Sequence, residues 1–121
     1  MEGLRKSEIG RVETVSVEGA LQIRLLGECD IYTAPTVLEH LRALLDCGAK
    51  RIIFDLEHVT FLDSSVLRIF LDARQATRPS GEVVLLCRPG FVRRLLTLLE
   101  LDKIVRIRTP EEWRDQIAAI N

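Results

Sequence analysis

The chain has 121 residues, which is enough to bury the core of one domain and too few for two. It is 47% hydrophobic and 29% charged, a composition that is typical of a globular fold and excludes a disordered chain. Because only 5% of the residues are aromatic and the net charge is −1, we expect no base-stacking platform and no electrostatic attraction to nucleic acid or to an anionic membrane.

The first elements form a predicted β-hairpin followed by a helix. The segments 12–17 and 20–27 flank Glu18 and Gly19, which is typical of two strands joined by a tight turn. Apolar residues then recur with helical spacing over 34–48, and the segment ends in a glycine, as many helices do. The apolar stripe of this predicted helix consists of Val37, Leu38, Leu41, Leu44 and Leu45.

Strands and helices then alternate to the end of the chain. The short apolar strand RIIFDL at 51–56 precedes a helix that begins near Ser64 and ends at about Thr77, before Pro79. The segment EVVLLC is apolar throughout, as expected for a strand covered on both faces. The remaining predicted elements are a helix at 89–101, a weak edge strand at 104–107 and a helix at 110–120, opened by Thr109 and Pro110.

This element order, β-β-α-β-α-β-α-β-α, predicts an α/β fold. We expect a single domain over 1–121, with its core at about 11–119, built on a mixed sheet with parallel central strands and about four helices. Loops that leave the carboxyl ends of parallel strands gather at one edge of the sheet, where ligands and partners bind. The two such loops predicted here are GECDIYTAP and HVTFLDSS. We therefore expect Asp30 and Ser65 to lie on the same edge, within about 10 Å, the diameter of a helix.

No cofactor or metal site is expected from the side chains available. The cysteines Cys29, Cys47 and Cys87 are widely spaced, and each lies in or beside an apolar run, so we expect buried free thiols without a disulfide or a metal. A glycine-rich phosphate loop is lacking. The sequence has no apolar run of the roughly 18 residues that a spanning helix needs, and the polar segment MEGLRKSEIG lacks a signal-peptide core. We therefore expect a cytoplasmic protein without direct membrane insertion.

Two linked motifs resemble a known family. The segment GECDIYTAPTV, followed by RIIFDLEHVTFLDSSVLRIFLDA, is similar to the STAS domain family, in particular to the bacterial anti-sigma factor antagonists. Members of that family typically show Gly-Glu-x-Asp, then a strand ending in Asp-Leu, then Asp-Ser-Ser or Asp-Ser-Thr followed by Gly-Leu. The later segment FVRRLLTLLELDKIVRI also resembles the third helix and last strand of the family. The resemblance covers residues 11 to about 119 and implies a single STAS-like domain.

The resemblance implies a non-enzymatic switch protein with no catalytic residue. Such an antagonist binds an anti-sigma factor that is also a serine kinase, and thereby frees a sigma factor. The kinase phosphorylates the second serine of the motif, here Ser65, the complex dissociates, and a serine phosphatase restores binding. The implied partner-binding surface consists of Asp30, Thr33, Asp63, Ser64, Ser65, Val66 and Arg68.

The physics of a helix start agrees with Ser65 as the phosphoacceptor. With Asp63 or Ser64 as N-cap, Ser65 lies in the first helical turn, where a phosphate gains about 0.3–1 kcal/mol from the helix dipole. In an interface, however, phosphoserine brings about −1.5 to −2 charges beside Asp63 and Asp30. Each unit charge at about 5 Å from a carboxylate costs about 3 kcal/mol at an effective dielectric of about 20. Repulsion therefore exceeds the helix term, and the complex weakens.

Several alternatives stay open. One alternative is that the serines only cap a helix. Another is that the protein is an unphosphorylated STAS accessory subunit or scaffold of a transporter or signalling complex. Val66 favours this second alternative, because it replaces the family glycine and a β-branched side chain would hinder a kinase. Arg68 pairs with a phosphate or is merely solvated. A hydrolase using His58 is not expected without a Gly-x-Ser-x-Gly motif. The oligomeric state is open, with a dimer among the alternatives.

Overall fold

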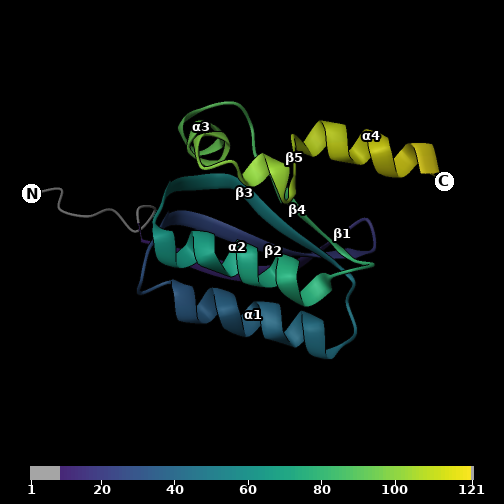
Figure 1. Ribbon diagram of the computed structural model, residues 1–121, viewed down its shortest axis with the longest axis horizontal. Coiled ribbons are helices and arrows are strands. Elements are labelled where there is room, and N and C mark those ends of the chain that lie inside the picture. Colours follow the sequence, from purple (N-terminus) through teal and green to yellow (C-terminus); the bar gives the residue numbers. More distant parts are fainter. Residues whose placement is uncertain (1–8, 121) are drawn as a thin grey trace, which may run out of the picture.

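The predicted α/β fold is confirmed by the computed structural model, which describes residues 9–120 (Figure 1). These residues form one five-stranded sheet of order β1-β2-β3-β4-β5, in which β1 is antiparallel to β2 and every other neighbour is parallel. The ends of the predicted 1–121 domain lie outside the described residues. The strands are β1 (Arg11–Val17), β2 (Ala20–Cys29), β3 (Arg51–Leu62), β4 (Glu82–Leu86) and β5 (Arg106–Arg108). The helices are α1 (Ala34–Asp46), α2 (Ser64–Thr77), α3 (Phe91–Leu98), the short 3-10 helix η2 (Leu101–Lys103) and α4 (Pro110–Ile120).

The N-terminal hairpin forms as predicted. Val17 pairs with Ala20, so only Glu18 and Gly19 remain in the turn, and both have a positive φ, 51° and 85°. Positive φ at both central residues defines the turn that matches the twist of two antiparallel strands, and glycine adopts it without steric cost. The hairpin places β1 at the outer edge of the sheet.

The two faces of the sheet are covered unequally. Along β3, Ile52 and Phe54 belong to the main core, which lies against α1 and α2, whereas Ile53 faces the other way. A smaller cluster of Ile53, Val84, Leu86 and Trp113 forms where α4 covers that second face. This division follows from the strand period of two, because neighbouring residues point to opposite faces. In Figure 1, α1 and α2 lie side by side, with α4 across the sheet from them.

The two central strands are longer than predicted. β2 extends to Cys29 and β3 to Leu62, so the segment HVTFL, predicted as a loop, is strand. The added pairs run from Leu26 with His58 to Cys29 with Leu62, across register shifts. The extension is stable because Val59 and Leu62 are buried in the main core. His58, which we expected in a loop, therefore lies in a strand.

Other corrections are local. Cys47, predicted to be buried, is exposed, because it lies at the end of α1 rather than on its apolar stripe, whereas Cys29 and Cys87 are buried. All three are free thiols. α3 begins at Phe91 and not at 89, and the edge strand occupies Arg106–Arg108 rather than 104–107.

Candidate functional site

Two aspartates lie together at the carboxyl edge of the sheet. Cys29 and Leu62 are register partners at the ends of β2 and β3, and Asp30 and Asp63 follow them directly. The backbone N–H of Asp63 also donates to the carbonyl of Cys29 at 3.2 Å. The expectation that Asp30 and the Asp-Ser-Ser segment share one edge is therefore confirmed, even though 33 residues separate the two acids in sequence.

Asp63 starts helix α2. Its backbone is extended, with φ −110° and ψ −179°, and it is the N-cap residue. Its Oδ1 atom accepts from the backbone N–H of Ser65 at 3.0 Å and of Val66 at 3.4 Å. The hydroxyl of Ser65 donates to the same oxygen. One carboxylate oxygen thus caps the helix and fixes the orientation of the Ser65 hydroxyl.

Asp30 builds a similar turn ahead of helix α1. Its Oδ1 accepts from the backbone N–H of Tyr32 at 3.0 Å and from the backbone N–H and the hydroxyl of Thr33, both at 3.3 Å. The Thr33 hydroxyl in turn accepts from the backbone N–H of Asp30 at 3.4 Å. The Asp30 side chain therefore satisfies free donors of its own loop.

The predicted surface residues differ in what they expose. Ser64 and Arg68 are exposed and Ser65 is half-buried. The prediction that Val66 belongs to the partner-binding surface is wrong. Its side chain is fully buried in the main core. Thr33 is also buried, at 8% exposure, so little of it is available to a partner. The helical period explains Val66, because the third residue of α2 turns toward the sheet.

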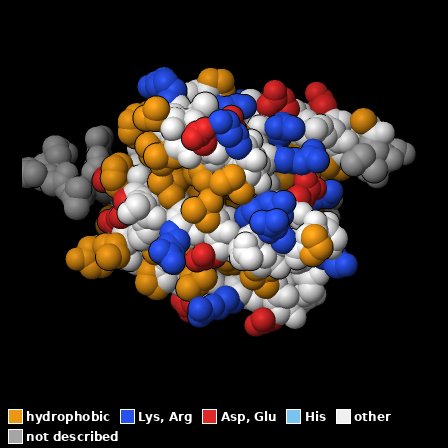
Figure 2. Space-filling view, viewed as in Figure 1, with side chains coloured by type: hydrophobic (Ala, Val, Ile, Leu, Met, Phe, Trp, Pro, Cys, Tyr) orange, Lys and Arg blue, Asp and Glu red, His pale blue; other side chains and the backbone are white. Residues whose placement is uncertain are grey.

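Large apolar side chains surround the polar edge, and the sequence reasoning missed them. Tyr32 is 89% exposed, Ile31 63% and Phe61 42%, all beside the two aspartates in sequence. A groove also runs from Ser64 along α2, lined by Leu67, Leu71, Leu99 and Leu101. Figure 2 shows hydrophobic side chains gathered over α2 and α3. The signal in the sequence was Ile31 and Tyr32, two large apolar residues inside a loop.

The buried thiol of Cys29 lies directly beneath the two acids. Burial, together with the smaller effects of the negative charges of Asp30 and Asp63, raises its pKa from 9.0 to about 11. Cys29 therefore stays protonated at neutral pH and has little nucleophilic character. The pKa of the Cys29 thiol can be measured, and it depends on the charges of both aspartates.

Metal ligands and membrane-spanning helices were also sought among the described residues. Residues 9–120 contain no group of three His, Cys, Asp or Glu side chains that would hold a metal ion. Within the same residues, no helix is long and apolar enough to cross a membrane. His58 is exposed on β3, and its ring makes no hydrogen bond to either serine of the described motif.

Comparisons with known proteins agree on one family. A family model described as "STAS domain" matches residues 11–112. An "Anti-sigma-B factor antagonist" of Staphylococcus aureus is 26% identical over 102 residues, covering 84% of this chain and 94% of that protein. The crystal structure of an anti-sigma factor antagonist from Mycobacterium paratuberculosis has a TM-score of 0.80 at 23% identity, covering 96% of this chain and 97% of its own. The phosphorylated form of the Bacillus cell fate determinant SpoIIAA has a TM-score of 0.65 at 25% identity, with 90% and 99% covered.

Proposed function

This chain belongs to the STAS domain family, and from that premise we propose that it is an anti-sigma factor antagonist. In this proposal it binds an anti-sigma factor with serine kinase activity and so frees a sigma factor in the cytoplasm. Phosphorylation of Ser65 ends the complex, and a serine phosphatase restores it. The observation that carries the proposal is the Ser65 hydroxyl, which lies in the first turn of α2 and is held by Asp63.

The contacts of Asp63 explain how a phosphate on Ser65 acts as an off signal. Asp63 already accepts the N–H groups of Ser65 and Val66, so a phosphate competes with a carboxylate for the same donors. The helix dipole offers at most about 1 kcal/mol to the new anion. Each unit of its charge costs about 3 kcal/mol at about 5 Å from a carboxylate in an interface with an effective dielectric of about 20. Phosphorylation therefore weakens the complex by at least about a hundredfold.

The apolar side chains at the edge support a protein partner. Tyr32, Ile31 and Phe61 are exposed next to the site, and the groove that begins at Ser64 is lined by leucines. Burying such side chains supplies the affinity of a protein interface, while charges near its centre decide whether it forms. Arg68, exposed one turn after Ser64, lies at the rim of the same groove, where it is available to an acidic group of the partner.

The buried Val66 removes the sequence argument for a scaffold without phosphorylation. That argument required the valine side chain to lie beside the phosphoacceptor on the surface. Because Val66 is fully buried in the core, its side chain does not stand in the way of a kinase at the surface. The antagonist reading is therefore preferred over the accessory-subunit reading.

The test is calorimetry of wild type, Ser65→Ala and Ser65→Asp against the cognate anti-sigma factor, before and after incubation with ATP. We expect Ser65→Ala to bind persistently and Ser65→Asp to bind more weakly than wild type, because one charge gives about half the effect of a phosphate. Raising the salt from about 0.05 to 0.5 M should recover part of the affinity that Ser65→Asp loses. Ser64→Ala is the matched control and should switch normally. Equal affinities for wild type, Ser65→Ala and Ser65→Asp would reject the switch and favour the scaffold.

A further inference from the structure

Strand β1 leaves one edge of the sheet open among the described residues. In the order β1-β2-β3-β4-β5, β1 pairs along its whole length with β2, and no other described strand lies on its outer side. In an antiparallel strand, the backbone N–H and C=O groups of alternate residues point away from the neighbouring strand, so this edge presents unpaired donors and acceptors. Such an edge is a template for one more strand.

The sequence of β1 does not protect this edge. Proteins commonly block an open edge with proline, lysine, a β-bulge or a very short strand. The segment RVETVSV contains no proline or lysine, and its seven residues pair with β2 in one register without a bulge. The other edge strand, β5, has only three residues. β1 is therefore the edge on which a further strand fits. Four of its residues are β-branched and favour an extended backbone, namely Val12, Thr14, Val15 and Val17.

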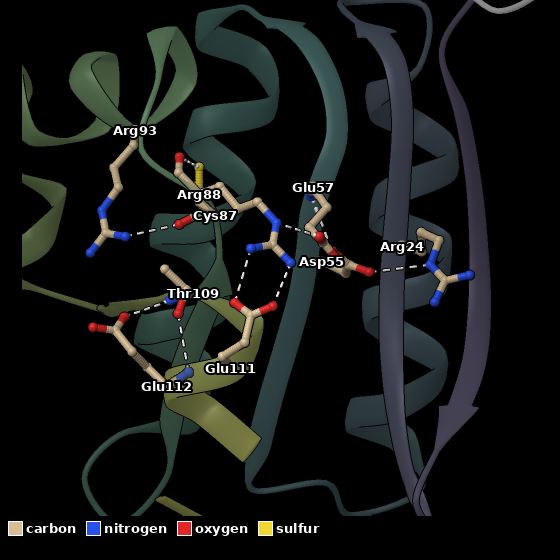
Figure 3. Close-up of polar contacts among 9 residues, drawn as sticks. All are labelled: Arg24, Asp55, Glu57, Cys87, Arg88, Arg93, Thr109, Glu111 and Glu112. Atoms are coloured by element: carbon tan, nitrogen blue, oxygen red, sulfur yellow. Dashed lines mark hydrogen bonds and ion pairs between the residues drawn. The ribbon is translucent and has the colours of Figure 1, made fainter. Parts of the chain in front are cut away.

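Two opposite charges on β1 indicate which strand fits. Glu13 lies opposite Arg24 of β2 and forms an ion pair with it, with Oε1 3.6 Å from Nη1. Arg24 also binds Asp55 of β3, as Figure 3 shows, so Glu13 lies on the face of the sheet that carries Asp55. Arg11 comes two residues before Glu13 and therefore lies on the same face. Both side chains are exposed, so β1 carries a positive and a negative charge next to each other at its open edge.

These two charges make β1 complementary to itself. When two identical strands pair antiparallel, a two-fold axis perpendicular to the sheet keeps each residue on its own face. With the axis at Val12, Arg11 of each copy lies opposite Glu13 of the other, which gives two equivalent ion pairs. An axis one residue to either side places Arg11 opposite Arg11 or Glu13 opposite Glu13, and like charges directly opposite each other are destabilising. An axis at Thr14 leaves both charges opposite valines. The charges therefore favour one partner and one register.

We propose that the open edge of β1 binds β1 of a second copy of this chain, antiparallel and centred on Val12. The two sheets then form one continuous sheet across the two-fold axis. The same register matches apolar side chains, because Ile9, which is 54% exposed, lies opposite Val15 of the second copy. Val12, which packs partly buried against the main core, lies opposite its own copy. The proposal does not rest on the proposed function, and either one can fail alone.

The test measures self-association of the full chain by sedimentation equilibrium from about 1 μM to about 1 mM, the range of a weak protein interface. We expect wild type to form a dimer in this range, and amide hydrogen exchange in β1 to slow as the dimer forms. Arg11→Glu and Glu13→Arg should each raise the Kd of the dimer about ten- to hundredfold, because two attractive pairs become repulsive. Arg94→Glu, a charge reversal at an exposed position of α3, is the matched control and should dimerise as wild type does.

A mixture of the two charge variants tests the register. The Arg11→Glu chain has two acids at its edge and the Glu13→Arg chain has two arginines, so each repels its own copy. In a heterodimer of the two variants both cross-strand pairs are attractive again, so an equimolar mixture should regain most of the lost affinity. Circular dichroism checks that both variants are folded.

Three results would each overturn the proposal. The first is a wild type that stays monomeric up to about 1 mM, which leaves the edge to a segment of another protein. The second is a dimer that neither charge reversal weakens, because its interface then lies elsewhere. The third is a mixture of the two folded variants that dimerises no better than either variant alone.

Discussion

The two aspartates at the carboxyl edge form nearly the same local structure with different results. Each follows a paired strand end, each precedes a helix, and each carboxylate binds a hydroxyl a few residues later, Thr33 for Asp30 and Ser65 for Asp63. The hydroxyl of Thr33 is buried and both donates to and accepts from Asp30. The hydroxyl of Ser65 has one bond, to Asp63, and is half-buried.

This difference teaches that local sequence chemistry does not by itself make a modification site. Thr33 is enclosed because Gly10, just before β1, lies against it and against the backbone of Glu28. In the first turn of α2, by contrast, Ser64 is exposed. We call the Asp30 turn closed because its hydroxyl, that of Thr33, is enclosed, while Ile31 and Tyr32 beside it stay exposed. In the Asp63 turn, Ser64 is exposed and Ser65 is half-buried.

The largest expected effect separates the two hydroxyls directly. With the cognate kinase and ATP, wild type and Thr33→Ala should both gain one phosphate, whereas Ser65→Ala should gain none. The reason is access, because a kinase must reach the hydroxyl oxygen. Mass spectrometry of the digested protein should assign the phosphate to Ser65. Label on Ser64 alone, or label that survives in Ser65→Ala, would contradict the assignment.

The charge of Asp63 should determine how strongly the phosphate acts. Asp63→Asn keeps an oxygen that caps α2 and removes one negative charge beside Ser65. Phosphorylated Asp63→Asn should therefore bind the anti-sigma factor at least about a hundredfold more tightly than phosphorylated wild type, because about 3 kcal/mol of repulsion per unit of phosphate charge at about 5 Å is lost. Asp30→Asn is the control from the closed turn, and phosphorylated Asp30→Asn should regain less affinity for the anti-sigma factor. Calorimetry on the three phosphorylated proteins makes the comparison, and an equal gain in affinity for both variants would remove the special role of Asp63.

Gly10 tests whether the closed turn depends on close contact. A methyl group added at Gly10 would overlap the backbone oxygen of Glu28 and the hydroxyl of Thr33. Gly10→Ala should therefore lower the free energy of unfolding by about 1–3 kcal/mol, the usual cost of overpacking. Ser16→Ala, at an exposed position of strand β1, which follows Gly10, should change it by less than about 0.5 kcal/mol. Urea unfolding measures both, and a Gly10→Ala protein as stable as wild type would show that the loop adapts.

The smallest effect concerns the thiol that both acids influence. Burial, Asp30 and Asp63 raise the pKa of Cys29 to about 11, with the effect of Asp30 larger than that of Asp63. Asp30→Asn should therefore lower this pKa more than Asp63→Asn does, measured by thiolate absorbance in a Cys47→Ser, Cys87→Ser background. The reverse order would mean that the two carboxylates lie differently around the thiol.

The same pKa shift has a consequence for stability. The folded protein holds the Cys29 proton to a higher pH than the unfolded chain does. The free energy of unfolding should therefore fall as the pH rises from 9.0 to about 11. Cys29→Ser should lose this part of the slope, while Cys47→Ser, at an exposed position, should keep it.

Much of this fold could be predicted from the sequence because its signals are local. The turn at Glu18 and Gly19, the apolar stripe of α1 and the start of α2 at the Asp-Ser-Ser motif depend on residues a few positions apart. The order of strands and helices then determined the parallel central sheet, and with it the shared edge of Asp30 and Asp63. The extension of β2 and β3 was missed, because the pairing of Cys29 with Leu62 joins distant segments.

The tertiary structure alone decided which side chains are accessible. Val66 is buried and Ser65 is not, although they are neighbours in sequence, because α2 turns one toward the sheet. Thr33 is enclosed by Gly10, which is 23 residues away in the chain. Gln22 and Trp113 line one cavity only because Gln22 points to the face of the sheet that α4 covers. Burial is a sum over contacts from the whole chain, and local sequence cannot determine it.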